Sequence, residues 1–409
     1  MSVVKTRRVL PILFVTLLLD MIGIGMIFPI IPIILTDPSS PSFLLHGFGT
    51  SAQYLIAGLL TGIFGLMQFI AAPILGEFSD AYGRKRLLTF GVGVLAVAQL
   101  MFGFAIVIGS LPLLFLSRAV AGLAAANFSI AQAAIADVTE PKDRAKNFGL
   151  VGAAFGLGFI IGPILGGWIL HLTGFASAPF WLAGALGVVN LMFISLFFPE
   201  TRKGDGSHDF HFLKGVRNIQ TAFRDVDARP VYLSSFLLQL GFGFFTAFIG
   251  ILLVSRFGFT ASAVGIFFGI TGAWIIFTQV VVLRIVTKQY NERAILRVSL
   301  ILVGAAIFAY GFVPSASLLY VVLPLLAVGN GLSVANLAAL ISKGVSGEKQ
   351  GAAMGINGSL QALAQGVAPV VAGVGAGFFG LQMPFVVGMV LALFAWAVLF
   401  VLPKRLVVT

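Results

Sequence analysis

Two charged side chains stand inside long apolar stretches of this chain, and they are its first candidates for chemistry. Asp20 lies in the stretch from Val9 to Leu35, and Arg118 lies in a second stretch at 112–136. A carboxylate among apolar residues can pass between its charged and neutral forms as its surroundings change, which is the chemistry of proton transfer. The alternative is a fixed ion pair between the two side chains that only stiffens the N-terminal half.

The depth of Asp20 favours proton transfer. A helix rises about 1.5 Å per residue, so Asp20 lies roughly 18 Å beyond Arg8 along the helix axis. The hydrocarbon core of a bilayer is about 30 Å thick, which places this carboxylate near the middle. The other acids lie in or beside predicted loops, apart from Asp37 at the outer end of the same stretch. We therefore predict that proton coupling uses Asp20 and Arg118.

Polar residues within the apolar stretches are candidates for a substrate pocket. Helical spacing places Ser129 and Gln132 on the face of Arg118, and it places Asn127 on the opposite face. We therefore expect Ser129 and Gln132, and not Asn127, to line the pocket. Five candidates come from the C-terminal half: Gln239, Thr246, Asn330, Gln361 and Gln365. Taken singly, each of these residues is also explained by a hydrogen bond between helices.

The elements that position these residues must lie in a membrane. The chain is 59% hydrophobic and only 10% charged, whereas soluble domains have about 25% charged residues. A membrane span needs about 20 mainly apolar residues. Twelve stretches qualify: 9–35, 52–75, 87–109, 112–136, 147–172, 178–198, 230–254, 260–283, 294–313, 317–341, 350–376 and 382–402. The predicted fold is an all-α membrane protein with twelve transmembrane helices. The first stretch exceeds the apolar region of a signal peptide, about 7–15 residues, so we expect it to remain as a helix.

The basic residues predict the orientation of these helices. Of the 25 Lys and Arg residues, all but Arg118 and Arg256 lie at alternate ends of the predicted spans. The cytoplasmic side of membrane proteins carries the excess of Lys and Arg, so both termini are predicted to be cytoplasmic. A multi-pass protein of a bacterial cytoplasmic (inner) membrane is expected. Charge spread over short loops does not form the clustered basic face that nucleic acid requires.

The chain divides into two similar halves. The long polar segment 199–229 separates an N-terminal six-helix bundle at 1–198 from a C-terminal bundle at 230–409. Residues 148–167 and 354–373 align without gaps, and Gly149, Gly152, Pro163 and Gly167 match Gly355, Gly358, Pro369 and Gly373. Parallel repeats of this kind build transporters, with the substrate site near the bilayer midplane between the repeats.

The segment GEFSDAYGRKR at 76–86 resembles the hallmark loop of the major facilitator superfamily, Gly-x-x-x-Asp-Arg-x-Gly-Arg-Arg/Lys. Gly76, Asp80, Gly83, Arg84 and Lys85 match this pattern, whereas Ala81 stands in place of the first Arg. The resemblance implies transport by alternating access, in which the two halves rock about a central site.

The same loop is expected to act as a conformational latch on the cytoplasmic side. Gly76 and Gly83 are expected to allow a tight turn, and Asp80 is expected to lie at a helix N-terminus. Arg84 is expected to pair with Asp137 at the end of the fourth span.

A second motif sharpens the resemblance. The segment GFIIGPILGG at 158–167 fits Gly-x-x-x-Gly-Pro-x-x-Gly-Gly through Gly158, Gly162, Pro163, Gly166 and Gly167. In the superfamily this pattern resembles the antiporter signature of drug and metabolite exporters. We expect these small residues to form a seam packed closely on a neighbouring helix.

Two further segments are similar to the tetracycline and multidrug efflux branch: LDMIGIGMIFPIIP at 19–32 and RAVAG at 118–122. The resemblance implies a proton-coupled antiporter that exports small amphipathic compounds, with protons and the lipid bilayer as partners. No acid lies deep in the C-terminal spans, so uncharged or cationic amphiphiles suit the pocket.

Two alternatives remain. One is a symporter or uniporter for a small metabolite such as a sugar or lipid precursor, and the other is a non-transporting scaffold or sensor on the same fold. The chain has no Cys and no recognisable nucleotide-binding loop or metal-ligand cluster. We therefore expect no enzymatic activity, no catalytic residues, no cofactor and no metal, and we expect a monomer.

Overall fold

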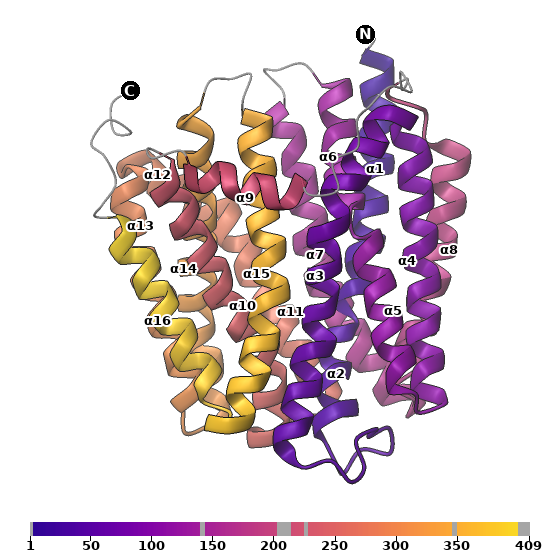
Figure 1. Cartoon of the computed structure of the whole chain (residues 1–409), viewed down its shortest axis with the longest axis vertical. Helices are drawn as coiled ribbons and strands as arrows, with labels where there is room; N and C mark the ends of the chain where they lie inside the picture. Colours follow the sequence, from indigo (N-terminus) through magenta and orange to yellow (C-terminus); the bar gives the residue numbers. More distant parts are fainter. Residues whose placement is uncertain (1–2, 140–143, 203–213, 225–227, 346–349, 400–409) are drawn as a thin grey trace. The chain divides into compact units, whose positions relative to one another are not determined.

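The computed structural model describes residues 3–139, 144–202, 214–224, 228–345 and 350–399 (Figure 1). Within these ranges the regular structure is helical, and eleven helical stretches are long and apolar enough to cross a membrane. A further apolar helix, Met383–Val398, is shorter. The predicted all-α membrane fold is confirmed.

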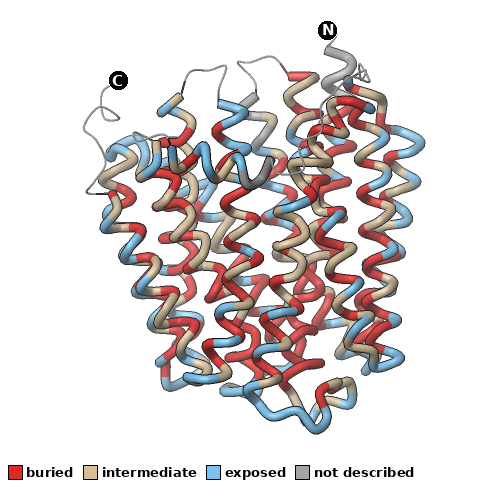
Figure 2. Tube along the Cα trace, viewed as in Figure 1, coloured by how far each residue is buried: buried red, intermediate tan, exposed pale blue. Residues whose placement is uncertain are grey.

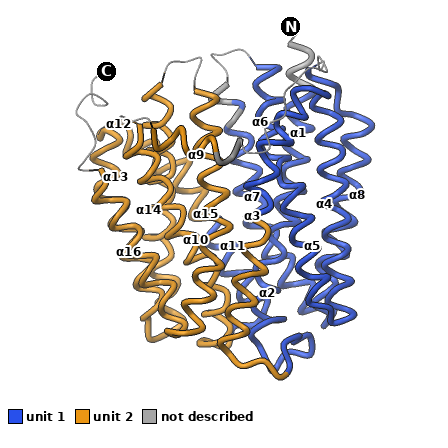
Figure 3. The backbone as a smooth tube through the Cα atoms, in the orientation of Figure 1, with its two compact units in different colours: residues 1–46, 67–212, 259–272 blue, residues 47–66, 213–258, 273–409 orange. Residues whose placement is uncertain are grey.

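The chain forms two compact units, shown in different colours in Figure 3. The first unit holds residues 1–46, 67–212 and 259–272. Its helices are α1 (Val3–Gly25), α2 (Ile27–Thr36), α4 (Arg84–Val107), α5 (Leu111–Ala124), α6 (Asn127–Val138), α7 (Arg144–Thr173) and α8 (Ala178–Phe197), with the second half of α3 (Thr50–Tyr82) and most of α11 (Ala261–Phe277).

The second unit holds residues 47–66, 213–258 and 273–409. Its helices are α9 (Lys214–Arg224), α10 (Arg229–Phe257), the π-helix η2 (Thr278–Val282), α12 (Leu283–Gln289), α13 (Glu292–Phe312), α14 (Ala316–Lys343), α15 (Gln350–Phe379) and α16 (Met383–Val398), with the first half of α3. Each unit therefore contains a segment from the other half of the chain, because α3 and α11 are shared between the units. The predicted linker 199–229 contributes α9, which packs on α15.

Local sequence signals fix several helix ends. The Ser110 side chain accepts a hydrogen bond from the Leu113 amide at 3.4 Å and caps α5. Asn291 caps α13 in the same way through the Ala294 amide at 2.9 Å. Gly258 ends α10 with φ of 65°, a left-handed conformation that favours glycine.

The fourth predicted span, 112–136, is not one continuous helix. It divides into α5 and α6 at Ala125 and Ala126, where the Ala125 amide donates to the Gly122 carbonyl at 3.1 Å. This bond reaches back three residues instead of four, so the turn is tighter than an α-helical turn. A face assigned from α5 therefore does not continue unchanged into α6.

The hallmark loop turns at one glycine and not at two. Gly83 separates α3 from α4 with φ of 97°, which only glycine adopts without strain. Gly76 lies within α3, and the expectation that it forms part of the turn was wrong.

Burial is distributed as a bilayer would require (Figure 2). Small, branched and aromatic side chains fill the interior of each unit. Large apolar side chains are exposed on helix surfaces, and Leu172 and Phe378 are 77% and 82% exposed. Such faces are unfavourable in water but are stable against lipid chains.

Candidate functional site

The segment 158–167 of α7, which carries the predicted antiporter motif, packs backbone against backbone on α1. A Cβ added to Gly162 would lie 2.6 Å from the Ile22 carbonyl oxygen, and one added to Gly166 would lie 2.6 Å from that of Met26. Gly158 meets the side chain of Met21 in the same row. Any larger side chain at these glycines would push α7 away from α1, so the motif determines how close these two helices lie.

The other side of α7 packs on α11, and we call this contact the first seam. A Cβ added to Gly265 would collide with the Pro163 carbonyl oxygen, and one added to Gly269 would lie 2.5 Å from Ile164 Cδ1. Ser262 Oγ donates to the Gly167 carbonyl at 3.1 Å. The first seam therefore joins a helix of the N-terminal half to a helix segment of the C-terminal half.

A second seam joins α15 to α3 within the second unit. A Cβ added to Gly58 would collide with the Pro369 carbonyl oxygen, and one added to Gly62 would lie 2.6 Å from that of Gly366. Ser51 Oγ donates to the Gly377 carbonyl at 2.6 Å. The spacing of glycines on α3, at 58, 62 and 65, is the same as on α11, at 265, 269 and 272.

Asp20 is buried in the interior of the first unit and is held by two amides. Asn127 Nδ2 on α6 donates to one carboxylate oxygen at 2.9 Å, and Asn190 Nδ2 on α8 donates to the other at 3.1 Å. All three residues are at most 5% exposed. Beside Asp20 lies a small crevice whose walls include Gly23 and Gln99. A buried carboxylate held by neutral donors has the chemistry to bind and release a proton.

Arg118 is also buried, on α5. Arg118 precedes Asn127 by nine residues. At a rise of about 1.5 Å per residue, its Cα lies about 13 Å from the Cα of Asn127, nearer the start of the fourth span. Ser129 and Gln132 are exposed on α6, and Asn127 is the residue of this span that contacts Asp20. The expectation that Asn127 points away from the site was wrong. Helical spacing placed Asn127 on the face opposite Arg118, and α1 with Asp20 packs on that face of α6.

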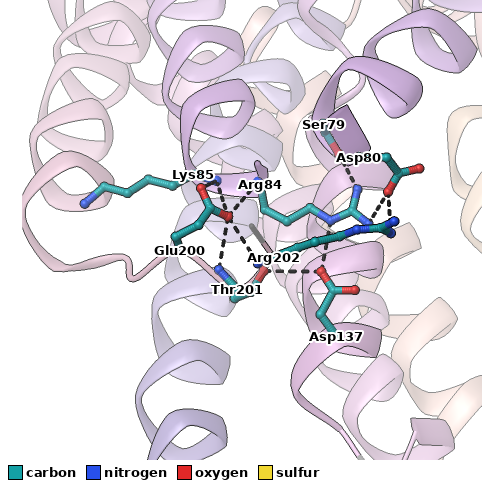
Figure 4. A network of polar contacts seen from close by, with 8 residues as sticks. All are labelled: Ser79, Asp80, Arg84, Lys85, Asp137, Glu200, Thr201 and Arg202. Carbon is teal, nitrogen blue, oxygen red and sulfur yellow. Dashed lines mark hydrogen bonds and ion pairs between the residues drawn. The ribbon is translucent and has the colours of Figure 1, made fainter. Parts of the chain in front are cut away.

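Arg84, at the start of α4, joins Asp80 and Asp137 in a cluster at the predicted cytoplasmic end of the first unit (Figure 4). Arg84 lies 2.5 Å from Asp80 and 3.0 Å from Asp137, and it also donates to the hydroxyl of Ser79. The expected contact between Arg84 and Asp137 is present, and Arg84 is buried despite its charge.

The acid at the N-terminus of α4 is Glu200, not Asp80. Its carboxylate accepts hydrogen bonds from the backbone amides of Arg84 at 2.7 Å and Lys85 at 3.2 Å. A carboxylate is stabilised there by the free amides and the positive end of the helix dipole. Asp80 lies in the last turn of α3, where Arg202 reaches it at 2.9 Å. The placement of Asp80 at a helix N-terminus was therefore wrong.

Segment 200–202 thus completes what we call the Arg84 cluster: Ser79, Asp80, Arg84, Asp137, Glu200, Thr201 and Arg202. Thr201 Oγ1 donates to Asp137 at 3.3 Å. Glu200 and Arg202 follow the sixth span directly, and that position next to a predicted charged loop is the signal that could have identified them.

The pocket candidates of the second unit lie on three helices. Gln239 and Thr246 on α10, Asn330 on α14 and Gln361 on α15 are partly buried, whereas Gln365 is exposed. Thr246 Oγ1 donates to the Gly243 carbonyl of its own helix at 3.3 Å. A shared pocket formed by these residues stays a prediction.

A sequence model of the Major Facilitator Superfamily matches residues 13–369 of this chain, and a further match covers 231–408. The chain belongs to this superfamily. Multidrug resistance protein 1 of Bacillus subtilis (strain 168) is 30% identical over 376 residues, which cover 90% of both chains. The class C tetracycline resistance protein of Escherichia coli is 29% identical over 373 residues, covering 90% of this chain and 89% of that protein. The molecule is thus a major facilitator transporter related to multidrug and tetracycline resistance proteins.

Solved structures of this superfamily share the fold over nearly the whole transporter. The human organic anion transporter MFSD10 is 25% identical with a TM-score of 0.73, covering 96% of this chain and 99% of that one. A bacterial homologue of the human lysosomal transporter Spinster, in an inward-facing and unoccupied conformation, has a TM-score of 0.78 at 17% identity, covering 99% and 98% of the two chains.

Proposed function

We propose that this transporter is a proton-coupled antiporter that exports small amphipathic compounds across a bacterial cytoplasmic membrane. The observation that carries the proposal is the buried carboxylate of Asp20, which is held by two neutral amides in the interior of the first unit. The names of the relatives, which include multidrug and tetracycline resistance proteins, support export of drug-like compounds.

Two kinds of contact support transport by alternating access. The first and second seams each join helix segments from opposite halves of the chain, so movement of one half against the other requires each seam to part. The Arg84 cluster acts at the predicted cytoplasmic end, where it ties α3, α4 and α6 to the segment after α8. The proposed cycle alternates between parting the seams and loosening the cluster.

In this cycle Asp20 binds a proton when the site is open to the outside and releases it when the site is open to the cytoplasm. Release leaves a carboxylate that favours a cationic or polar compound, and Arg118 assists the change of charge from α5. Candidate substrate contacts are Ser129 and Gln132 in the first unit and, taken separately, Gln239, Thr246, Asn330, Gln361 and Gln365 in the second unit.

The test uses full-length protein in sealed vesicles with an imposed pH gradient and a panel of dyes and antibiotics that includes tetracycline. The wild-type protein should concentrate at least one compound against its gradient. Asp20→Asn should lose this uphill transport and keep part of the downhill exchange, because the neutral side chain cannot carry a proton. Uphill transport by Asp20→Asn at the expense of protons would refute the assignment of Asp20. Absence of transport of every compound by the wild type would favour a metabolite carrier.

A further inference from the structure

The two amides that hold Asp20 belong to the two elements that lead to two of the three acids of the Arg84 cluster, Asp137 and Glu200. Asn127 opens α6, and Asp137 lies ten residues later on the same helix. Asn190 lies on α8, and Glu200 follows ten residues later, just beyond that helix. One buried carboxylate is thus connected to one surface cluster by two short stretches of chain.

The two amides differ in how they are held. Asn190 Nδ2 donates to Asp20 and also to the Thr16 carbonyl at 3.2 Å, so its orientation is fixed by two acceptors. Asn127 Nδ2 donates to Asp20 alone among the described residues. The Oδ1 atoms of both asparagines are buried without a hydrogen-bond partner there, so the single acceptor of its NH₂ group is what distinguishes Asn127. Its orientation therefore depends on the charge state of Asp20.

A carboxylate and a protonated carboxyl group demand different neighbours. The carboxylate only accepts hydrogen bonds, so an amide presents its NH₂ group, as both asparagines do here. A protonated carboxyl group has an O–H donor that needs an acceptor, and neither NH₂ group provides one. A half-turn of the Asn127 amide would bring its free Oδ1 to Asp20 and supply that acceptor, while Asn190 keeps its two bonds.

The surroundings of Asn127 allow a rotation of its amide to affect the Arg84 cluster. A Cβ added to Gly91 on α4 would collide with Asn127 Oδ1, so this glycine is what gives the amide its present place. The break at Ala125 and Ala126 separates α6 from α5. At about 1.5 Å per residue, Asp137 lies roughly 15 Å from Asn127 along the same rigid helix, and it contacts Arg84 at 3.0 Å.

No titratable side chain lines the crevice beside Asp20 in the described part of the chain: its other walls are Leu19, Gly23, Val92, Leu95, Ala96, Gln99, Ala183 and Gly187. On the described parts of the surrounding helices, the charged residues lie near the predicted cytoplasmic end, at the starts of α1, α4 and α7 and at Asp137, apart from Arg118 on α5. His171 lies in the last turn of α7, at the other end of that helix. Asp20 is thus the titratable group that Asn127 contacts.

We propose that Asn127 is a positioning residue that transmits the protonation state of Asp20 to the Arg84 cluster through α6. With Asp20 charged, the arrangement in the structure is stable and the cluster is formed. With Asp20 protonated, Asn127 turns, α6 shifts and the contact between Asp137 and Arg84 weakens. The inference rests on the proposed proton coupling, and it adds the connection between the carboxylate and the cluster.

The test places a reporter in the cluster. The chain has no Cys, so an Ala81→Cys substitution gives a single thiol, and position 81 is only 3% exposed next to Asp80. The rate of alkylation of this thiol is measured at alkaline pH, where the carboxylate form of wild-type Asp20 prevails, on purified full-length protein in lipid vesicles. Asp20→Asn, which is permanently neutral, should raise the rate about fivefold, a typical coupling between two sites. Asn127→Ala should raise it by a similar factor, and the double variant should show no further increase, because both changes act in one path.

Matched controls separate this path from general loosening. Ser117→Ala removes a buried hydrogen bond on α5, on the other side of the break, and should leave the alkylation rate unchanged. Asn127→Ser is a second variant in case alanine prevents folding, since its hydroxyl is too short to replace both amide atoms. An unchanged rate in Asp20→Asn, or independent increases that multiply in the double variant, would overturn the proposal. Proton-driven transport is measured in parallel on the Ala81→Cys protein. If proton-driven transport is present but the alkylation rates contradict the expectation, only the transmission through Asn127 is refuted. If proton-driven transport is absent, the proton coupling itself is refuted.

Discussion

The helices α7 and α15 carry the repeated proline. Each has one side where the contact residues are of the same kind in both helices, and one side where they differ. In the first seam Pro163 faces Gly265, and in the second seam Pro369 faces Gly58. On the side facing their own half, the motif glycines of α7 correspond to alanines of α15, all fully buried: Ala364, Ala368 and Ala372 in place of Gly158, Gly162 and Gly166.

This difference separates two roles within the antiporter motif. The features common to both helices, the proline and its glycine partner, belong to the seams between the halves of the chain. The glycines particular to α7 belong to its contact with α1, the helix that carries Asp20. On α15 the corresponding contact is with α10, where Gly243 gives the room, since a Cβ there would lie 2.7 Å from that of Ala368. The complete motif at 158–167 therefore occurs in the half of the chain that contains the buried carboxylate of Asp20.

The largest loss of transport is expected when a bulky side chain is introduced into the contact between α7 and α1. In Gly166→Leu the new side chain would start 2.6 Å from the Met26 carbonyl oxygen, where backbone and not a flexible side chain stands in the way. Overpacking of this kind costs about 1–3 kcal/mol and forces backbone shifts. We expect the variant to insert in the membrane and to lose more than about 95% of vesicle exchange, since a loss of about 2 kcal/mol corresponds to roughly thirtyfold.

Gly152→Leu is the matched control on the same helix, because a Cβ at Gly152 has no atom within 4 Å. It should exchange at nearly the rate of the wild type. Full activity of Gly166→Leu would show that the contact between α7 and α1 tolerates a wider spacing, and the distinction between the two proline helices would then lose its functional meaning.

A smaller and equal effect is expected in the two seams. Gly58→Ala and Gly265→Ala each introduce one methyl group against a proline carbonyl oxygen, Pro369 or Pro163. If both seams must part and close in each cycle, the two variants should slow exchange by a similar factor, about tenfold for a cost of roughly 1.4 kcal/mol. Initial rates in vesicles, normalised to the amount of inserted protein, measure this. A loss in only one of the two variants would break the equivalence of the seams.

The sequence was sufficient to predict the fold and one contact of the cluster. Apolar stretches of membrane length predicted the helices because the bilayer requires them, and the repeat of Pro163 and Pro369 pointed to the paired proline helices. Arg84 and Asp137 were predicted as partners because Asp137 ends the fourth span on the same predicted side of the membrane as Arg84. The partners of the proline helices were not predicted, since nothing in a single sequence says which glycine stripe faces which.

The contacts of Asp20 and Glu200 depended on features that helical spacing does not contain. A wheel drawn through 112–136 assumes one continuous helix and says nothing of which face meets α1, so it rejected Asn127. Asn190 was an amide in the apolar stretch 178–198 and could have been noticed for that reason. Glu200 accepts a hydrogen bond at the N-terminus of α4 from an amide 116 residues earlier in the sequence. No rule based on neighbouring residues predicts a contact between positions so far apart.

The smallest effect is expected when α15 is given a glycine of the α7 pattern. Ala368→Gly removes a methyl group that is 0% exposed and packs at Gly243 of α10. A glycine inside a helix costs about 1 kcal/mol relative to alanine, so the thermal unfolding midpoint in detergent should fall by a few degrees. Exchange should stay within about twofold of the wild type, because this contact lies inside one half and parts in no step of the proposed cycle. Ala309→Gly, on α13 at a partly buried position, serves as the control for helix propensity alone. If Ala368→Gly lowered exchange as far as Gly58→Ala does, the spacing between α15 and α10 would be as important for transport as the seams, and the division of roles between the two sides of the proline helices would be wrong.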